Sequence, residues 1–185
     1  MNFAKHYNLR GFHAPFSPSQ PSWLKYTDER TIEVYSNRKA AEQGTKLHEW
    51  AKTTIDLGIK QPRSKKTIYA YVNDAIGFQM DTEVILYYSE RFFGTADAIS
   101  FRNGLLRIHD LKTGIRPVHI EQLRIYAALF CLEYQEKPEN IEIELRIYQN
   151  DDMQLERPDA EVIREIMDHI VHLDKLLQTL EKEGG

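Results

Sequence analysis

Cysteine is almost absent from this chain of 185 residues, in which Cys131 is the only one. A single thiol cannot form an internal disulfide, and it excludes both a cysteine-built zinc site and an iron–sulfur cluster with four thiolate ligands. Long apolar runs are missing too. None approaches the roughly 18 residues that cross a bilayer, and the first residues lack the apolar stretch of a signal peptide. We therefore expect a cytoplasmic protein with no membrane partner.

A strong overall charge is also missing. The 24 Lys and Arg residues are balanced by 28 Asp and Glu residues, which gives a formal net charge of −4. This total does not indicate a nucleic-acid partner, although a carboxylate-rich active site can offset a local basic groove. The sequence has no internal repeat and no low-complexity tract, and its length suits one domain with a real core.

Hydrophobic periodicity and turn residues predict the elements of that single domain, 1–185. Apolar residues spaced by three to four indicate helices, and alternation indicates strands. The domain divides into an N-terminal helical part (17–80), a core (81–150) and a C-terminal helix (158–182). The other expected elements are a short helix over 23–26, helices over 38–57, 67–78 and 117–134, and strands over 83–89, 94–102, 105–112 and 141–148. This order predicts an α/β fold with a central mixed β-sheet flanked by helices.

A hairpin lies at the centre of the predicted core. Asn103-Gly104 separates two strand-like runs, and this dipeptide favours the type I′ turn of a two-residue hairpin. Such a turn fixes the register of the two strands. It predicts that Asp97 lies opposite Asp110 and that Thr95 lies opposite Lys112.

Two opposed carboxylates at this position indicate a cation between them. Directly opposed Cβ atoms lie roughly 4.5–5.5 Å apart, and like charges there are destabilising. Lys112 shares the strand face of Asp110, because side chains two apart on a strand point the same way. Carboxylate oxygens suit Mg²⁺ or Mn²⁺, so we expect one or two such ions on Asp97 and Asp110, with the Leu111 carbonyl as a further ligand. The alternative is a surface salt-bridge cluster.

The order of these residues resembles that of the PD-(D/E)XK nuclease superfamily. Asp97 is followed by Asp110-Leu111-Lys112 on the next strand, and then by Gln122 and Tyr126 on the following helix. More narrowly, the chain is similar to the RecB-like exonuclease branch, which includes Cas4-like nucleases and small phage-encoded members. That branch carries a histidine on an upstream helix, which is matched here by His48.

The resemblance covers about residues 17–150, and no helicase segment accompanies it in this sequence. Two further departures concern particular residues. The chain lacks the cluster cysteines of Cas4-like members, and Gly94-Thr95-Ala96 precedes Asp97 where the superfamily's name places a proline. The resemblance implies a restriction-endonuclease-like core, with 81–150 as the catalytic part. It also implies hydrolysis of phosphodiester bonds in DNA with Mg²⁺ or Mn²⁺.

The roles of the remaining site residues follow from the resemblance. It implies that His48 ligates a second metal ion, and that Gln122 and Tyr126 position Lys112 and the DNA strand. Lys112 itself holds the attacking water or stabilises developing negative charge. The alternatives to these roles are structural. His48 could be a core histidine, and Gln122 and Tyr126 could be a hydrogen-bonding side chain and a core aromatic residue. His109 points to the opposite strand face from Asp110, and we interpret it as structural.

Basic side chains near these motifs are candidate DNA contacts. Arg63, Lys65 and Lys66 share a predicted loop, which could equally be a solvated surface. Arg116 and Arg124 flank the start of the helix that carries the glutamine and tyrosine, which makes them better candidates for phosphate contacts.

Together these features predict a metal-dependent deoxyribonuclease that degrades linear DNA from its ends. We expect it to act in phage or prophage recombination, replication or repair, with a phage recombination protein or a single-strand-binding protein as partner. Two alternatives are a catalytically inactive relative that binds DNA or a partner, and a structure-specific endonuclease. The intact acid–acid–lysine set argues against the first, and Gln122-x-x-x-Tyr126 favours an exonuclease over the second.

Overall fold

The computed structural model of the chain describes residue 7 and residues 14–114 and 119–183. Contacts between residues divide the chain into two compact units, Met1–Thr45 and Lys46–Gly185, and each is described by itself. The boundary between the units falls within the long helix α1 (Asp28–Asp56). The assignment of 1–185 to one domain stays a prediction.

The first unit contains the short 3-10 helix η2 (Pro21–Lys25) and the first turns of α1. Pro21 stands at the start of η2, where a missing N–H removes no hydrogen bond. The indole N–H of Trp23 donates to the carbonyl oxygen of Ser17 (2.9 Å). A short helix is therefore present in the region where the sequence predicts one.

Helix α1 begins at Asp28 rather than at the predicted residue 38. The backbone N–H of Arg30 donates to the hydroxyl of Thr27 (3.3 Å), and two acidic residues, Asp28 and Glu29, occupy the first turn. A capping hydroxyl and negative charge both stabilise a helix start. This signal precedes the apolar stripe on which the prediction was based.

The second unit is built on a five-stranded sheet with the order β1-β2-β3-β4-β5. Neighbouring strands are antiparallel except for β3 and β4, which are parallel. The mixed sheet of the predicted α/β fold is thereby confirmed. The strands are β1 (Asp81–Ser89), β2 (Phe92–Arg102), β3 (Leu105–Leu111), β4 (Glu142–Gln149) and β5 (Asp152–Glu156).

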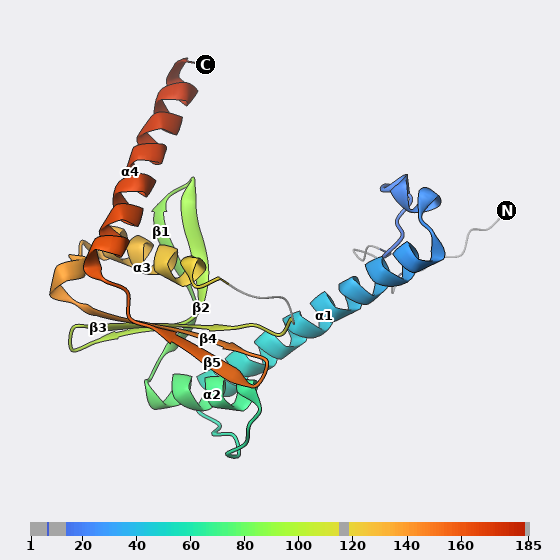
Figure 1. The fold of residues 1–185 in the computed structure, drawn as a ribbon, viewed down its shortest axis with the longest axis horizontal. Coiled ribbons are helices and arrows are strands. Elements are labelled where there is room, and N and C mark those ends of the chain that lie inside the picture. The colour runs from blue at the N-terminus through green and yellow to red at the C-terminus, as the bar shows by residue number, and fades with distance from the viewer. Residues whose placement is uncertain (1–6, 8–13, 115–118, 184–185) are drawn as a thin grey trace. The chain divides into compact units, whose positions relative to one another are not determined.

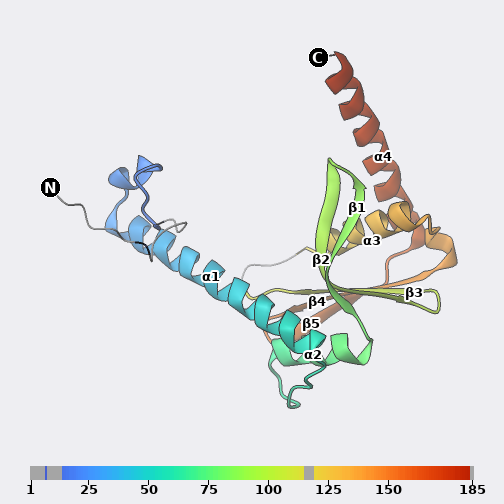
Figure 2. The same ribbon diagram turned by 180° about the vertical axis from the view of Figure 1, so that it is seen from behind.

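Helices cover both faces of this sheet. Figure 1 shows α3 (Glu121–Tyr134) and α4 (Ala160–Glu183) on one side and α2 (Thr67–Gly77) on the other. Residues 46–56 of α1 pack on the same side as α2 through Ala51 and Ile55. Figure 2 shows from behind that β1 and β2 curve away from the other strands and along α3. No helix in the described parts of the chain is long and apolar enough to cross a membrane.

Strand alternation explains how one sheet supports two cores. Leu106 and Ile108 of β3 join the cluster under α3 and α4, whereas Leu111 of β3 and Tyr148 of β4 join the cluster under α1 and α2. Successive side chains point to opposite faces of a strand, so Asp110 lies on the α3 side. The connection between the parallel strands is made by α3 and the short 3-10 helix η3 (Pro138–Asn140).

Most other element boundaries agree with the predicted ranges, with two further corrections. The helix predicted over 117–134 begins at Glu121 in the structure, and residues 115–118 lie outside the described part. Strand β5 was not predicted, because four of its five residues are exposed and none is buried. A turn signal precedes it, since Asn150 (φ 53°) and Asp151 (φ 58°) both adopt the positive φ of a two-residue hairpin turn.

Candidate active site

The hairpin that carries the candidate site has the predicted turn and register. Asn103 (φ 53°) and Gly104 (φ 74°) are both left-handed, as a type I′ turn requires. The strand pairs run from Arg102 with Leu105 to Ala98 with His109. The next position in this register is that of Asp97 and Asp110, so the sequence correctly predicts that these two acids meet at one place.

The ladder between β2 and β3 ends just before the two acids. Beyond this point the backbone N–H of Lys112 donates to the carbonyl oxygen of Tyr148 on β4 (2.9 Å), and Thr95 pairs with Ile85 of β1. The ladder does not extend to Thr95 and Lys112, so their predicted opposition stays a prediction. Like charges directly opposed in a ladder are destabilising, which explains why pairing stops where the carboxylates begin.

Asp97 lies where the two strands separate, and its side chain is 19% exposed. Its Oδ2 atom accepts a hydrogen bond from the Leu111 backbone N–H (3.0 Å) and lies 3.5 Å from Nδ1 of His48. Burial and the nearby charge of Asp110 raise the pKa of Asp97 to about 6, against the lowering effect of the Leu111 N–H. Ionisation of Asp97 at neutral pH therefore costs free energy in the folded protein.

The Asp110 side chain is only 4% exposed. Its Oδ1 atom accepts a hydrogen bond from the ammonium group of Lys112 (3.0 Å), but its Oδ2 atom is buried without a hydrogen-bond partner among the described residues. Burial raises the pKa of Asp110, although Lys112 acts in the opposite direction. Asp110 therefore forms an ion pair with Lys112, but its carboxylate lies beneath the surface rather than on it.

A chain of polar side chains continues from Lys112 to helix α3. The Lys112 ammonium donates to Gln122 Oε1 (3.1 Å), and Gln122 Nε2 donates to the hydroxyl of Tyr126 (3.3 Å). Gln122 and Tyr126 lie one turn apart on the same helix face. The structure therefore brings together both helix residues and the lysine that the sequence predicts they position.

Gly94 is a site-supporting residue that the sequence analysis missed. A Cβ atom at this position of β2 would lie 2.8 Å from Cε1 of Tyr126, so only glycine lets the tyrosine ring approach the strand. A glycine within a strand often marks such a close approach, which is the signal that points to it. Gly94 thus helps to seat the ring whose hydroxyl holds Gln122.

Glu83 marks a backbone irregularity in β1 beside Asp97. Its neighbours pair regularly, Thr82 with Ala98 and Val84 with Ala96, but Glu83 itself has a φ of 53°. A left-handed conformation costs a residue with a side chain about 1 kcal/mol. Backbone strain of this kind concentrates at functional sites.

The possible metal ligands of the site are the carboxylates of Asp97 and Asp110 and the imidazole of His48. No group of three or more His, Cys, Asp or Glu side chains that could hold an ion is assembled within residues 14–114 and 119–183. The contacts are pairwise instead: His48 with Asp97, and Asp97 electrostatically with Asp110. Mg²⁺ is commonly held by one or two carboxylates plus waters and substrate phosphates, so the unpartnered oxygen of Asp110 beside Asp97 fits it. Leu111 uses its N–H here, and its predicted carbonyl ligation stays a prediction.

The predicted DNA-contacting arginines and lysines have different surroundings. Arg124 donates two hydrogen bonds, both 2.7 Å, to the carboxylate of Glu156 on β5, so a phosphate would have to compete with this ion pair. Arg116 lies outside the described residues. Arg63, Lys65 and Lys66 are exposed on the loop before α2, as predicted from the sequence.

His109 lies on the opposite sheet face from Asp110, as predicted. It is fully buried on the α2 side, where its ring contacts Phe78 and Tyr148. Burial lowers its pKa to about 3, and the charge of Arg146 adds to this effect. His109 is therefore neutral at physiological pH, and its side chain lies on the opposite sheet face from that of Asp110.

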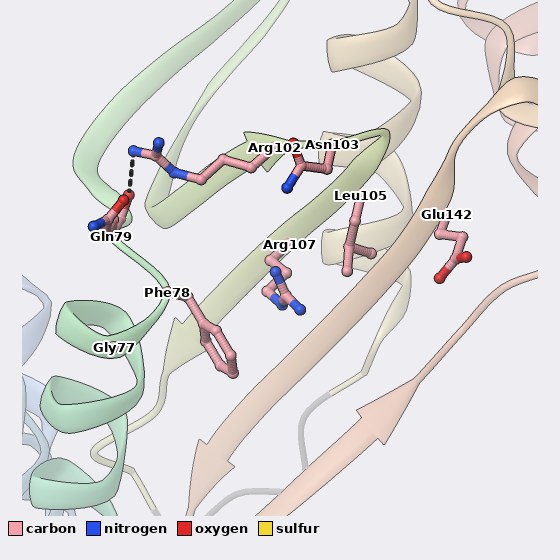
Figure 3. Close-up of a pocket in the computed structure, with 8 residues that line it drawn as sticks. All are labelled: Gly77, Phe78, Gln79, Arg102, Asn103, Leu105, Arg107 and Glu142. Carbon is pink, nitrogen blue, oxygen red and sulfur yellow. Dashed lines mark hydrogen bonds between the residues drawn. The ribbon is translucent and has the colours of Figure 1, made fainter.

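A separate hollow of about 370 Å³ lies at the turn end of the same hairpin (Figure 3). In it the Arg107 guanidinium lies 4.3 Å from the centre of the Phe78 ring, and Arg102 donates to the Gln79 carbonyl oxygen (3.3 Å). The predicted catalytic residues are at the other end of β3. We therefore assign the candidate active site to the end of the hairpin where the acids lie.

The sequence was compared with models of known protein families and with curated proteins. Neither comparison gives a match.

Proposed function

We propose that this protein is a metal-dependent deoxyribonuclease that hydrolyses phosphodiester bonds. The observation that carries the proposal is the buried, unpartnered Oδ2 of Asp110 beside Asp97. Buried polar atoms in folded proteins nearly always have a partner, and among the three buried side-chain atoms without one in the described structure this oxygen alone belongs to a carboxylate, which supports a cation as the ligand. A divalent cation satisfies this oxygen and offsets the repulsion between the two carboxylates.

The chain's own residues divide the work in this proposal. Asp97 and Asp110 hold Mg²⁺ or Mn²⁺, which when bound activates water and polarises a phosphoryl oxygen. The Lys112 ammonium, fixed by Gln122, lies against Asp110 and stabilises negative charge that develops on the phosphate. His48, adjacent to Asp97, is the candidate ligand of a second ion.

The resemblance to RecB-like exonucleases supports action on linear DNA from its ends, in a cytoplasmic process of phage or prophage recombination, replication or repair. Gln122 and Tyr126 support this assignment, because Gln122 contacts Lys112 directly and donates a hydrogen bond to Tyr126.

The test is incubation of the purified protein with end-labelled linear DNA and with covalently closed circular DNA, in Mg²⁺ or Mn²⁺ and in chelator. We expect metal-dependent loss of linear DNA from its termini while circles survive. Rapid cutting of the circles would instead identify an endonuclease. Absence of metal-dependent cleavage in both substrates would contradict the proposed activity and favour a relative that only binds DNA.

His48 decides between one ion and two. We expect His48→Ala to lower the Mn²⁺ stoichiometry measured by calorimetry from two to one and to slow cleavage strongly. An unchanged stoichiometry together with a near-normal rate would show that His48 is not a ligand.

A further inference from the structure

Two aromatic rings form a partly exposed pair on the α2 side of the second unit. The rings of Trp50 on α1 and Tyr69 on α2 are 6.1 Å apart between centres and tilted by 43°. Trp50 is 39% exposed, although large aromatic residues are usually mostly buried. The ammonium of Lys66 lies 5.4 Å from the centre of the Tyr69 ring, which adds a cation to the same surface.

The segment that contains Tyr69 is the most basic stretch of the unit. Residues 57–73 contain four cations and no Asp or Glu, in a chain whose formal net charge is −4. The four are exposed: Lys60, Arg63, Lys65 and Lys66. Their charge complements a polyanion, and the adjacent rings offer flat apolar faces.

This surface lies at the same edge of the sheet as the candidate active site. At the start of α2, the N–H and hydroxyl groups of Thr67 both donate to Asp151 Oδ1 (3.2 Å) in the turn between β4 and β5. At the adjacent end of β4, the carbonyl oxygen of Tyr148 accepts the hydrogen bond from Lys112. Figures 1 and 2 both show the start of α2 close to the turn between β4 and β5.

Helix α1 provides a second link between the two places. Trp50 follows His48 by two residues, which is about 3 Å along a helix axis, on a different side of the helix. His48 contacts Asp97 while Trp50 contacts Tyr69. The aromatic pair is thus held by the same helix that reaches the acids.

We propose that Trp50 and Tyr69 form a stacking platform for single-stranded DNA, with Lys65 and Lys66 contacting its phosphates. Aromatic faces and a basic surface together bind single strands with little sequence preference. In a duplex the base faces are already stacked on one another and cannot reach the rings. The inference rests on the proposed nuclease function, because it assigns the strand that the site receives.

The test measures binding without cleavage. A fluorescein-labelled oligothymidylate of about 12 nucleotides is titrated with the full chain in chelator, and its anisotropy is followed. Stacking contributes enough per base that Trp50→Ala and Tyr69→Ala should each weaken binding about tenfold to a hundredfold. The matched control is Tyr134→Ala, which removes an exposed ring at the end of α3 and should leave binding unchanged.

Charge is tested by salt dependence. Each phosphate contact on a single strand contributes about 0.7 to the slope of log affinity against log salt. Lys65→Ala should therefore reduce the slope by about that amount, whereas Lys175→Ala, on exposed α4, should not. An equal slope in Lys65→Ala and wild type would contradict the phosphate contact.

A second measurement does not depend on removing the ring. The chain has two tryptophans, so Trp23→Phe leaves Trp50 as the only indole reporter. The oligonucleotide should quench its fluorescence saturably. No quenching, equal binding of duplex DNA, or tighter binding of the matching RNA would each overturn the inference.

The outcomes separate this inference from the proposed activity. Metal-dependent DNA cleavage without quenching of Trp50 would overturn the platform alone. Saturable quenching without cleavage in Mg²⁺ or Mn²⁺ would support the platform and overturn the nuclease.

Discussion

Glu144 on β4 and Asp110 on β3 are two carboxylates buried to the same extent on opposite faces of one sheet. Their side chains are 3% and 4% exposed. Glu144 accepts hydrogen bonds from three arginines, Arg107, Arg146 and Arg157. Asp110 accepts one from Lys112 and leaves its second oxygen without a partner in the described structure.

The electrostatic consequences of these surroundings are opposite. Burial acts to raise the pKa of Glu144, but the hydrogen bond from Arg157 and the charge of Arg146 lower it overall. Burial raises the pKa of Asp110, and a single lysine does not reverse the shift. A fully paired buried carboxylate stabilises a fold, whereas an underpaired one is poised for a ligand. The surroundings of the two carboxylates therefore distinguish a structural network around Glu144 from a candidate catalytic one around Asp110, without reference to sequence motifs.

The largest expected effect is on catalysis. Asp110→Ala, Asp97→Ala and Lys112→Ala should each reduce cleavage of labelled linear DNA by about 10³-fold or more, and their effects should not add, because the residues act as one unit. DNA binding should persist or strengthen, since repulsion from the carboxylates falls. The control is Asp168→Ala, an exposed acid on α4. Wild-type turnover by Asp110→Ala would remove the distinction between the two carboxylates.

The free energy of unfolding should respond most to substitution of Glu144. Glu144→Ala leaves Arg107 and Arg157 without their partner, and breaking a buried ion pair typically costs about 3 kcal/mol or more. Denaturant unfolding should show this loss, while the exposed neighbour Glu142 changed to alanine should shift stability by less than about 0.5 kcal/mol. If Glu144→Ala matched Glu142→Ala, the arginine network would not be structural.

The pH dependence of stability gives a smaller effect. The pKa of Asp97 is about 6 in the folded protein, above its ordinary value of 3.8, so ionising Asp97 opposes folding. In chelator its contribution to stability is fully present below about pH 4 and is lost as the pH rises through about 6; the full loss is about 3 kcal/mol, and about half of it falls between pH 5 and pH 7.5. Wild type should therefore gain stability relative to Asp97→Asn between pH 7.5 and pH 5, as measured by urea unfolding.

A bound cation should stabilise the folded protein with Asp97 ionised, whereas ionisation of Asp97 without metal opposes folding. A cation that binds only the folded protein stabilises it by mass action, so millimolar Mn²⁺ at pH 7.5 should raise the melting temperature of wild type more than that of Asp97→Asn. Two results would count against a cation between the acids. One is an equal dependence of stability on pH in the two proteins, and the other is a melting temperature that does not change with metal.

The smallest effect is expected at Gly94. An added methyl group would lie 2.8 Å from Cε1 of Tyr126, so it displaces the tyrosine ring and loosens Gln122 and Lys112. Gly94→Ala should slow cleavage about tenfold and cost about 1 kcal/mol of stability. In Tyr126→Leu the same substitution should have little further effect, because the two positions are coupled. Gly77→Ala, with no atom within 4 Å of the added Cβ, is the matched control.

Local pattern explains which parts of the fold could be predicted from the sequence. Asn103-Gly104 sets a register through a two-residue turn, so the meeting of Asp97 and Asp110 follows from sequence alone. The end of the ladder at that point does not, because it depends on a balance between backbone pairing and charge repulsion. The start of α1 was missed because its cap, Thr27, lies before the apolar stripe.

The unpredicted strand β5 explains why the sequence does not reveal that Arg124 is already paired. Strand β5 has no buried residue, so hydrophobic alternation does not reveal it. Without β5, the partner of Arg124 could not be foreseen, because Glu156 lies at the end of that strand. Edge strands draw their stability from the neighbouring strand rather than from a core, and their side chains carry little pattern.

The parallel pairing of β3 with β4 has a consequence for the order of folding. The two acids belong to a hairpin closed by two residues, and such hairpins form within about 1–10 μs. The bond from Lys112 to Tyr148 and the support from Gln122 both require the long crossover through α3, and distant contacts slow folding. The carboxylates and the adjacent Lys112 are thus brought together before Gln122 fixes the lysine, so a chain stalled at the hairpin stage would hold two repelling acids beside a lysine that no helix residue orients.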